Sequence, residues 1–157
     1  MPTLESLSFE DIEVGQSLRM SRTVTEDMVR LFAAASGDIN PVHLDDDFAA
    51  TTPFKGRIAH GMLTAGFISA AIAGGLPGPG SVYVSQELRF DRPVRVGDTI
   101  TVELTVQEKI PGKNHVLLKT VARNQNNKTV VAGVATVLPP PLRARIEQPE
   151  EPRFLPG

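Results

Sequence analysis

Three side chains that can exchange protons or hold water stand close together in one short segment. The run SGDINPVHLD, residues 36–45, contains a carboxylate at Asp38, an amide at Asn40 and an imidazole at His43. Pro41 stiffens the chain between them, because its ring fixes one backbone angle. An Asp and a His that share one water could take a proton from it and deliver a proton elsewhere, as hydration of a double bond requires. The ordinary alternative is an Asp that caps a turn beside a surface His.

A second segment, GRIAHGML at residues 56–63, places a glycine where a buried helix is expected to begin. The first N–H groups of a helix have no partner inside it and lie at the positive end of its dipole. A thioester carbonyl docked on the N–H of Gly61 would be polarised there. The missing side chain would let the substrate approach closely. The alternative is that Gly61 only allows the loop to pack tightly on the helix.

Together these two segments resemble the MaoC-like (R)-specific enoyl-CoA hydratases, also called hydratase 2, and the likeness extends over about residues 8–138. The resemblance implies an α+β hot-dog fold, an antiparallel sheet wrapped round a central helix, usually as a dimer with joined sheets. It implies that Asp38 and His43 are catalytic and that Asn40 orients water or one of the pair. It also implies an oxyanion hole at Gly61 and a substrate contact at Ser69.

The implied reaction converts a trans-2-enoyl-CoA into an (R)-3-hydroxyacyl-CoA. Coenzyme A would be part of the substrate, so no separate cofactor is expected. Sequence alone leaves the acyl chain length, the physiological direction and the choice of base within the pair open.

The elements that position these residues begin with two helices. Thr23 and Glu26 have capping-box spacing before a run of apolar residues on one helical face, and Gly37 is expected to end that helix. Residues 38–57 are expected to be irregular. A second helix should run from about residue 60 to 73. Its apolar residues lie almost all round it, so it should be central and covered on most sides.

After residue 80 the pattern changes to strands separated by short turns, which predicts an antiparallel sheet. The strands are expected over residues 81–90, 99–110, 115–123 and 129–138. Strands packed on a long buried helix indicate the α+β class.

The chain is expected to form one domain, residues 1–138, followed by a proline-rich tail, residues 139–157. Six of the thirteen prolines lie in this tail. Proline lacks the N–H that a sheet needs, so the tail is expected not to continue the sheet and to be an extended arm or disordered.

Composition narrows the partners and the compartment. The net charge of −2 argues against a nucleic-acid partner, which usually requires a basic face. The absence of cysteine excludes disulfides, thiolate nucleophiles and most zinc sites. No signal peptide and no membrane span are visible, so we expect a cytoplasmic protein that does not act at a membrane. A small sheet leaves an edge strand unpaired, which favours a homodimer or a higher homo-oligomer.

Other polar residues have ordinary interpretations. Three consecutive acids beside His43 could suggest a cation, but their side chains point in different directions, so no metal is expected. His60 is expected to bond to the backbone at the helix start, and His115 to be solvated. Ile72 could line the acyl pocket or belong to the core. Three arginines are expected to be solvated instead of holding the phosphates of coenzyme A: Arg89, Arg92 and Arg95.

Three other functions are weighed against the hydratase. A 3-hydroxyacyl-carrier-protein dehydratase would run the same chemistry in reverse, but an acidic carrier needs a basic rim and the net charge is negative. A non-catalytic acyl-CoA-binding module could lose the acid/base pair without harm, whereas this sequence has the pair, Asn40 and Gly61 together. A thioesterase would have to direct its water at the carbonyl carbon instead of at C3.

Overall fold

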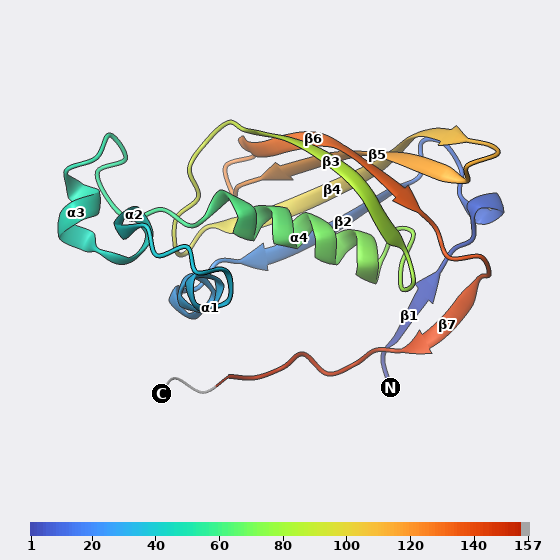
Figure 1. Cartoon of the computed structure of the whole chain (residues 1–157), viewed down its shortest axis with the longest axis horizontal. Helices are drawn as coiled ribbons and strands as arrows, with labels where there is room; N and C mark the ends of the chain where they lie inside the picture. Colours follow the sequence, from blue (N-terminus) through green and yellow to red (C-terminus); the bar gives the residue numbers. More distant parts are fainter. Residues whose placement is uncertain (155–157) are drawn as a thin grey trace.

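Five antiparallel strands form a curved sheet with one long helix lying against it (Figure 1). The computed structural model describes residues 1–154. The strand order is β2-β4-β5-β6-β3, and a separate two-stranded sheet joins β1 to β7. The strands are β1 (Thr3–Ser6), β2 (Ser17–Thr23), β3 (Val82–Phe90), β4 (Thr99–Ile110), β5 (His115–Arg123), β6 (Thr129–Leu138) and β7 (Ala144–Glu147). The helices are η1 (Phe9–Asp11), α1 (Glu26–Ser36), α2 (Pro41–Leu44), α3 (Asp46–Ala50) and α4 (Gly61–Gly74).

The core lies between α4 and the concave face of the sheet. Alternate residues of β4 are at most 1% exposed, since one face of the strand packs on the helix while the other does not. The α+β prediction of an antiparallel sheet round a helix is therefore confirmed, and the four strands expected after residue 80 all form. The β4 residues that face the helix are Ile100, Val102, Leu104 and Val106.

The helix α4 is covered on one side only, which corrects the expectation that most of its sides would be covered. Ile68 and Ile72 are at most 3% exposed against the sheet. The opposite side is exposed and consists of Met62 and small residues: Gly66, Ala70 and Ala73. An all-round apolar pattern made partly of glycine and alanine does not require burial within one chain, because these residues expose little apolar area.

The helix α1 begins two residues later than the capping-box prediction. Thr25, not Thr23, is the N-cap, and its hydroxyl accepts a hydrogen bond from the N–H of Met28 at 3.2 Å. Thr23 ends β2, and its hydroxyl meets that of Thr99 at 2.8 Å. Strand pairing therefore competes successfully for Thr23. Gly37 ends the helix with φ of +77°, a conformation that suits glycine, so that prediction is confirmed.

Residues 38–57, expected to be irregular, contain the short helices α2 and α3. Each is started by the side chain of its N-cap residue: Asn40 accepts from the N–H of Val42, and Asp45 accepts from the N–H of Phe48. Pro41 occupies the first position of α2, where its missing N–H costs nothing. Single turns of helix have too short a pattern to be detected by periodicity.

Both ends of the chain form structure that the sequence analysis did not predict. β1 pairs with β7 in antiparallel register, with Thr3 opposite Glu147 and Ser6 opposite Ala144. Over the described residues the tail stays out of the five-stranded sheet, but it contributes a strand of its own. The strand lies in the proline-free stretch 142–148, so the prolines on either side do not prevent it.

In the part of the chain described here, no helix combines the length and the apolar character needed to cross a bilayer.

Candidate active site

Asp38 and His43 lie together at the junction of α1 and α2. Gly37 turns the chain at the end of α1, so Asp38 is the first residue beyond the turn, and α2 carries His43 back towards it. Asp38 Oδ2 and His43 Nε2 are 3.9 Å apart. That gap is too long for a direct hydrogen bond, but one water oxygen could lie about 2.8 Å from both atoms. The Asp38 side chain is 49% exposed and that of His43 is 9% exposed, so the pair has a solvent side and a buried side.

The ring of His43 is oriented by a backbone carbonyl. Its Nδ1 lies 2.8 Å from the oxygen of Ile58. Because a carbonyl oxygen can only accept, Nδ1 carries a hydrogen, and the Nε2 of a neutral ring keeps its lone pair. That lone pair belongs to the atom nearest Asp38 Oδ2. A neutral imidazole and an ionised carboxylate would each offer an acceptor to a water between them.

Asn40 contacts the site through both its backbone and its side chain. Its N–H donates to Asp38 Oδ1 at 3.2 Å. Its side-chain oxygen accepts from the N–H of Val42 at 3.1 Å and thereby starts the helix that carries His43. The structure therefore places Asn40 where it can hold both members of the pair, and its catalytic role remains a prediction.

Gly61 is the first residue of α4, and His60 is the N-cap residue. Within residues 1–154 the N–H of Gly61 makes no hydrogen bond, as an oxyanion donor requires. A Cβ at this position would lie 2.7 Å from Cε1 of Phe90, so a side chain would have to displace that ring. Both the polarising role and the packing role therefore have support in the geometry.

An ion-pair network that the sequence did not reveal holds the segment carrying His43 against α1. The guanidinium of Arg57 binds both carboxylate oxygens of Glu26 at 2.8 and 3.0 Å and reaches Asp46 at 2.8 Å. The same group donates to the carbonyl oxygen of His43 at 3.4 Å. Hydrogen bonding from Arg57 holds the pKa of Glu26 below its ordinary value of 4.5. The partners are 31 residues apart, so no local pattern could have revealed the pair.

The family model described as "MaoC like domain" matches residues 9–128. This chain belongs to the MaoC-like family. It is 50% identical over 132 residues to an (R)-specific enoyl-CoA hydratase of Rhodospirillum rubrum, a match that covers 84% of this chain and 91% of the relative. It is 44% identical to a 3-hydroxybutyryl-CoA dehydratase of Methylorubrum extorquens, covering 89% of this chain and 88% of that one.

Solved structures agree with this MaoC-like assignment. An unliganded R-hydratase from Pseudomonas aeruginosa superposes with a TM-score of 0.93 at 48% identity, and the match covers 99% of this chain and 100% of that one. The (R)-hydratase of Aeromonas caviae gives a TM-score of 0.79 at 43% identity, over 82% of this chain and 97% of that one. The predicted family and the hot-dog fold are confirmed. The first match extends over most of the tail, for which the sequence alone offered no counterpart.

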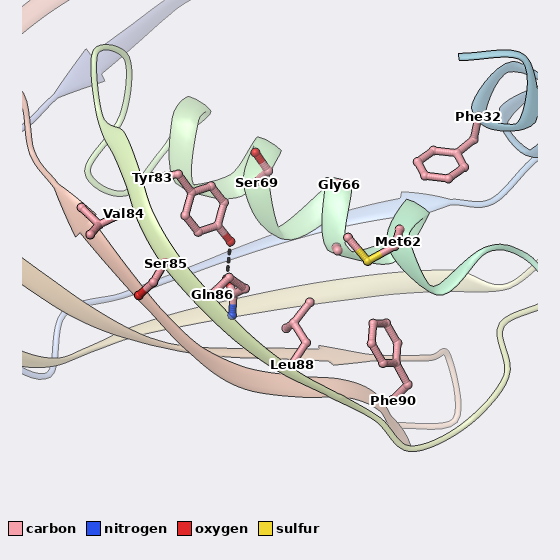
Figure 2. A pocket seen from close by; sticks show the side chains of 11 residues that line it. Phe32, Met62, Gly66, Ser69, Tyr83, Val84, Ser85, Gln86, Leu88 and Phe90 are labelled. Carbon is pink, nitrogen blue, oxygen red and sulfur yellow. Dashed lines mark hydrogen bonds between the residues drawn. The ribbon is translucent and has the colours of Figure 1, made fainter. Parts of the chain in front are cut away.

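A largely apolar cavity of about 620 Å³ lies between α4 and β3 of this MaoC-like chain (Figure 2). Ser69 lines it, near Tyr83, while Met62, Phe32 and Phe90 lie at the other end. Asp38 and His43 do not line the cavity, but Phe32, which does, packs against the ring of His60. Ile72 is only 3% exposed and absent from the cavity lining, so of its two interpretations the structure favours the core.

A second cavity of about 310 Å³ lies on the other side of Phe90 and is lined by Gly61 and Arg92. Phe90 lines both cavities, so its ring stands between them at the start of α4. Gly61 therefore lines the smaller cavity, whose wall carries the charged residues Asp91 and Arg92, and Phe90 separates it from the apolar one.

His60 and the three arginines, for which no catalytic role was predicted, form hydrogen bonds within the chain. His60 is 2% exposed, and its Nε2 donates to the carbonyl oxygen of Asp38 at 2.9 Å, as expected for a histidine bonded to backbone. The three arginines were expected to be solvated; Arg89 and Arg92 are exposed, Arg95 is half-buried, and each also forms a hydrogen bond within the chain. Arg89 pairs with Asp91, Arg92 donates to the carbonyl of Thr129, and Arg95 donates to the carbonyls of Phe54 and Arg57.

Asp38, His43 and His60 offer ligand atoms that lie within 4.8 Å of one another, a spacing that raises the question of a metal. The two rings are stacked, with centroids 3.8 Å apart and planes 28° apart. Lone pairs of nearly parallel rings do not converge on one ion, which needs both nitrogens at about 2.0–2.1 Å. Each ring also uses one nitrogen on a carbonyl oxygen. We keep the prediction that the site uses no metal.

Proposed function

We propose that this protein adds water to the double bond of a trans-2-enoyl-CoA to give (R)-3-hydroxyacyl-CoA, with Asp38 and His43 as the acid/base pair. The observation that carries the proposal is the 3.9 Å separation of Asp38 Oδ2 and His43 Nε2. Both atoms are acceptors, at a distance that one water can span. The predicted enzyme class, a hydro-lyase, is confirmed by the relatives, which are named as enoyl-CoA hydratases and as a 3-hydroxybutyryl-CoA dehydratase.

The proposed chemistry needs only these two groups and a polarised carbonyl. The shared water loses one proton to Asp38 or His43 while its oxygen bonds to C3. Electron density moves from the double bond towards the thioester oxygen. The group that took the proton, now an acid, delivers a proton to C2, so both transferred groups come from water and the enzyme returns to its starting state.

The N–H of Gly61 would stabilise the charge that develops on the thioester oxygen. It is free of protein partners in the described residues and lies at the positive end of α4. A donor fixed in place before the reaction acts without reorganisation, which is the main advantage of an oxyanion hole. The acyl chain would extend into the cavity beside Ser69, which is lined mostly by apolar groups. No cofactor is required beyond the coenzyme A of the substrate.

The choice between coenzyme A and a carrier protein rests on the relatives. A mitochondrial 3-hydroxyacyl-carrier-protein dehydratase of Arabidopsis thaliana is 33% identical over 143 residues, lower than the identity to the coenzyme A enzymes. This difference and the net charge of −2 favour free coenzyme A. Comparing kcat/KM for crotonyl-CoA with that for the crotonyl thioester of a carrier protein would decide between them. We also retain the homodimer and the cytoplasmic location as predictions.

The first test follows the loss of enoyl absorbance with crotonyl-CoA. Asp38→Asn keeps the shape of the side chain and removes its basicity, and His43→Ala removes the imidazole. Each should lower kcat by about 10²- to 10⁴-fold, the usual contribution of a positioned acid or base. Near wild-type rates in either folded variant would contradict the pair.

The stereochemistry gives a second, independent test. If one water lies between Asp38 and His43, hydroxyl and proton should reach the same side of the enoyl plane. Hydration in heavy water should therefore place deuterium at C2 syn to the new hydroxyl, and an (S)-specific dehydrogenase should not consume the product. Anti addition would exclude the shared water, whereas consumption by the (S)-specific enzyme would exclude the (R) product.

A further inference from the structure

His60 contacts all three parts of the proposed catalytic site. Its backbone is adjacent to Gly61 at the start of α4. Its Nε2–H donates to the carbonyl oxygen of Asp38 at 2.9 Å. Its ring stacks on that of His43, with centroids 3.8 Å apart. The one side chain of His60 therefore contacts both Asp38 and His43.

The second nitrogen of His60 indicates that the imidazole is not there for packing alone. Nδ1 is buried and has no hydrogen-bond partner in the described residues. An unsatisfied buried polar atom is destabilising, and an aromatic hydrocarbon ring would avoid that cost. Phe32 already packs against the same ring, with centroids 4.8 Å apart, so the surroundings accept an aromatic neighbour. The polar edge of the ring must therefore serve another purpose, and its one hydrogen bond goes to Asp38.

Each contact restricts a different freedom of the pair. Asp38 follows Gly37, whose φ of +77° lets the chain turn, so the Asp38 peptide has no helix to hold it. Its N–H donates to the hydroxyl of Ser36 at 3.1 Å, and the bond from His60 restrains its carbonyl. The ring of His43 is held at one nitrogen by Ile58, and the stacked ring of His60 covers one face of it, which blocks rotation about the bond to the ring.

We propose that His60 is a positioning residue, which sets the separation of Asp38 Oδ2 and His43 Nε2 and places both relative to the N–H of Gly61. It touches neither the water nor the substrate in this proposal. The inference rests on the proposed function, because positioning has a catalytic consequence only if Asp38 and His43 are the acid/base pair.

Three substitutions separate the two contacts. His60→Phe keeps the stacked ring and removes the donor to Asp38. His60→Gln can place an amide donor near the position of Nε2 and removes the ring. His60→Ala removes both. The control is His115→Phe, because His115 lies at the start of β5, away from the pair. Thermal midpoints are measured for all variants, so that loss of fold is distinguished from loss of position.

We expect His60→Ala to lower kcat with crotonyl-CoA by about 100-fold with little change in KM, since misplacement of about 1 Å can cost that much. His60→Phe and His60→Gln should each recover part of the loss, and His115→Phe should match the wild type. The proposal is overturned if His60→Ala keeps kcat within about twofold of the wild type. It is also overturned if His60→Phe restores full activity, because packing would then suffice.

The Asp38→Asn variant and a structural measurement distinguish the two hypotheses. If Asp38→Asn is as active as the wild type, the proposed function fails, whatever His60 does. Positioning is then judged from the nitrogen and proton resonances of the His43 ring. These should change in His60→Ala if His60 orients that ring, and unchanged resonances would overturn the inference without reference to activity.

Discussion

At the scale of single residues, the site works through backbone atoms as much as through side chains. Asn40 illustrates this, because its amide oxygen faces the N–H of Val42 while its own N–H holds Asp38. The resemblance to hydratases implied that Asn40 orients water or one of the pair. The geometry supports the second option in an indirect form: Asn40 starts the turn of helix that carries His43.

Replacing Asn40 therefore tests capping and catalysis together. Asn40→Ala removes the cap, which typically costs about 1 kcal/mol, and should loosen His43 enough to lower kcat about tenfold. Asn40→Ser retains an oxygen that can cap the helix and should recover most of the stability and part of the activity. Thermal denaturation and crotonyl-CoA kinetics measure both effects. Equal activity of the alanine and wild-type proteins would show that the cap does not position His43.

At the scale of secondary-structure elements, Arg57 joins the segment that carries His43 to the first turn of α1. Glu26 is the partner that titrates. Its hydrogen bonds from Arg57 lower its pKa in the folded protein, so the ion pair stabilises the fold above the ordinary value of 4.5 and this stabilisation is lost as the pH falls through the lower, folded value. The Glu26 side chain is 43% exposed, so solvent screening will keep the effect modest.

The corresponding prediction compares thermal midpoints at pH 7 and at pH 3. Glu26→Gln should be less stable than the wild type at pH 7, and the difference should shrink as the pH falls below 4.5. Glu10→Gln, at an exposed glutamate of η1, is the matched control and should follow the wild-type curve. A difference between Glu26→Gln and wild type that stays constant down to pH 3 would exclude titration of this carboxylate as the cause.

The strand β3 has a bulge in the part that lines the larger cavity. The register shifts between Tyr83 and Ser85, so Tyr83 and Gln86 both point towards α4. The Tyr83 hydroxyl donates to the side-chain oxygen of Gln86 (Figure 2), and the amide of Gln86 donates to the hydroxyl of Thr120 at 3.1 Å. Tyr83 lies beside Ser69 at the end of the cavity away from Phe90 and Met62, and Gln86 lies between Tyr83 and Leu88 along its wall. Bulges near active sites commonly redirect side chains in this way.

Shortening Tyr83 should therefore change the preferred acyl length. In Tyr83→Ala, kcat/KM for 2-octenoyl-CoA relative to crotonyl-CoA should rise at least about tenfold, the usual value of accommodating one or more methylenes. Tyr83→Phe keeps the ring and removes only the bond to Gln86, so its chain-length preference should match that of the wild type. If Tyr83→Ala leaves the ratio unchanged, the acyl chain does not reach this end of the cavity.

The sequence predicted the elements whose signal is local and repeated. Alternation identified β4, and the all-round apolar run identified α4, because both patterns extend over ten or more residues. The missed elements are short or polar: β1 and β7 have four residues each, and β2 is an edge strand with few buried positions. Their formation depends on pairing with segments far away in the chain, which no window of sequence displays.

In the candidate site, too, some features could be predicted from the sequence and others could not. The 36–45 segment and Gly61 could be selected because residue type and spacing suffice for a resemblance. The contacts of His43 with Ile58 and of Glu26 with Arg57 could not, since each joins segments 15 or 31 residues apart through a fold that must already exist.

At the scale of the whole molecule, one side of the chain exposes a group of large apolar side chains. β3 is the edge strand of the sheet, and large apolar side chains on it are exposed: Val82 by 53%, Val84 by 47% and Phe90 by 52%. The uncovered side of α4 adds Met62 at 58%. The larger cavity lies between these same two elements. A second copy placed edge to edge would pair the unpaired backbone of β3 and cover this face.

The dimer is therefore predicted to use this face and to complete the cavity. Ala70→Arg places a charge in the middle of the exposed side of α4, where the single chain has room for it but a partner would not. We expect the wild type to sediment as a dimer or larger at micromolar concentration. Ala70→Arg should dissociate it and lower kcat/KM for crotonyl-CoA, because the cavity loses its partner wall. Val14→Arg, at a turn residue that is 63% exposed, is the control and should remain associated and active.

A wild-type monomer would contradict the dimer, and an associated Ala70→Arg variant would place the interface on another face. A dissociated variant with full activity would show that each chain completes its own cavity, so that association protects the β3 edge without contributing to catalysis.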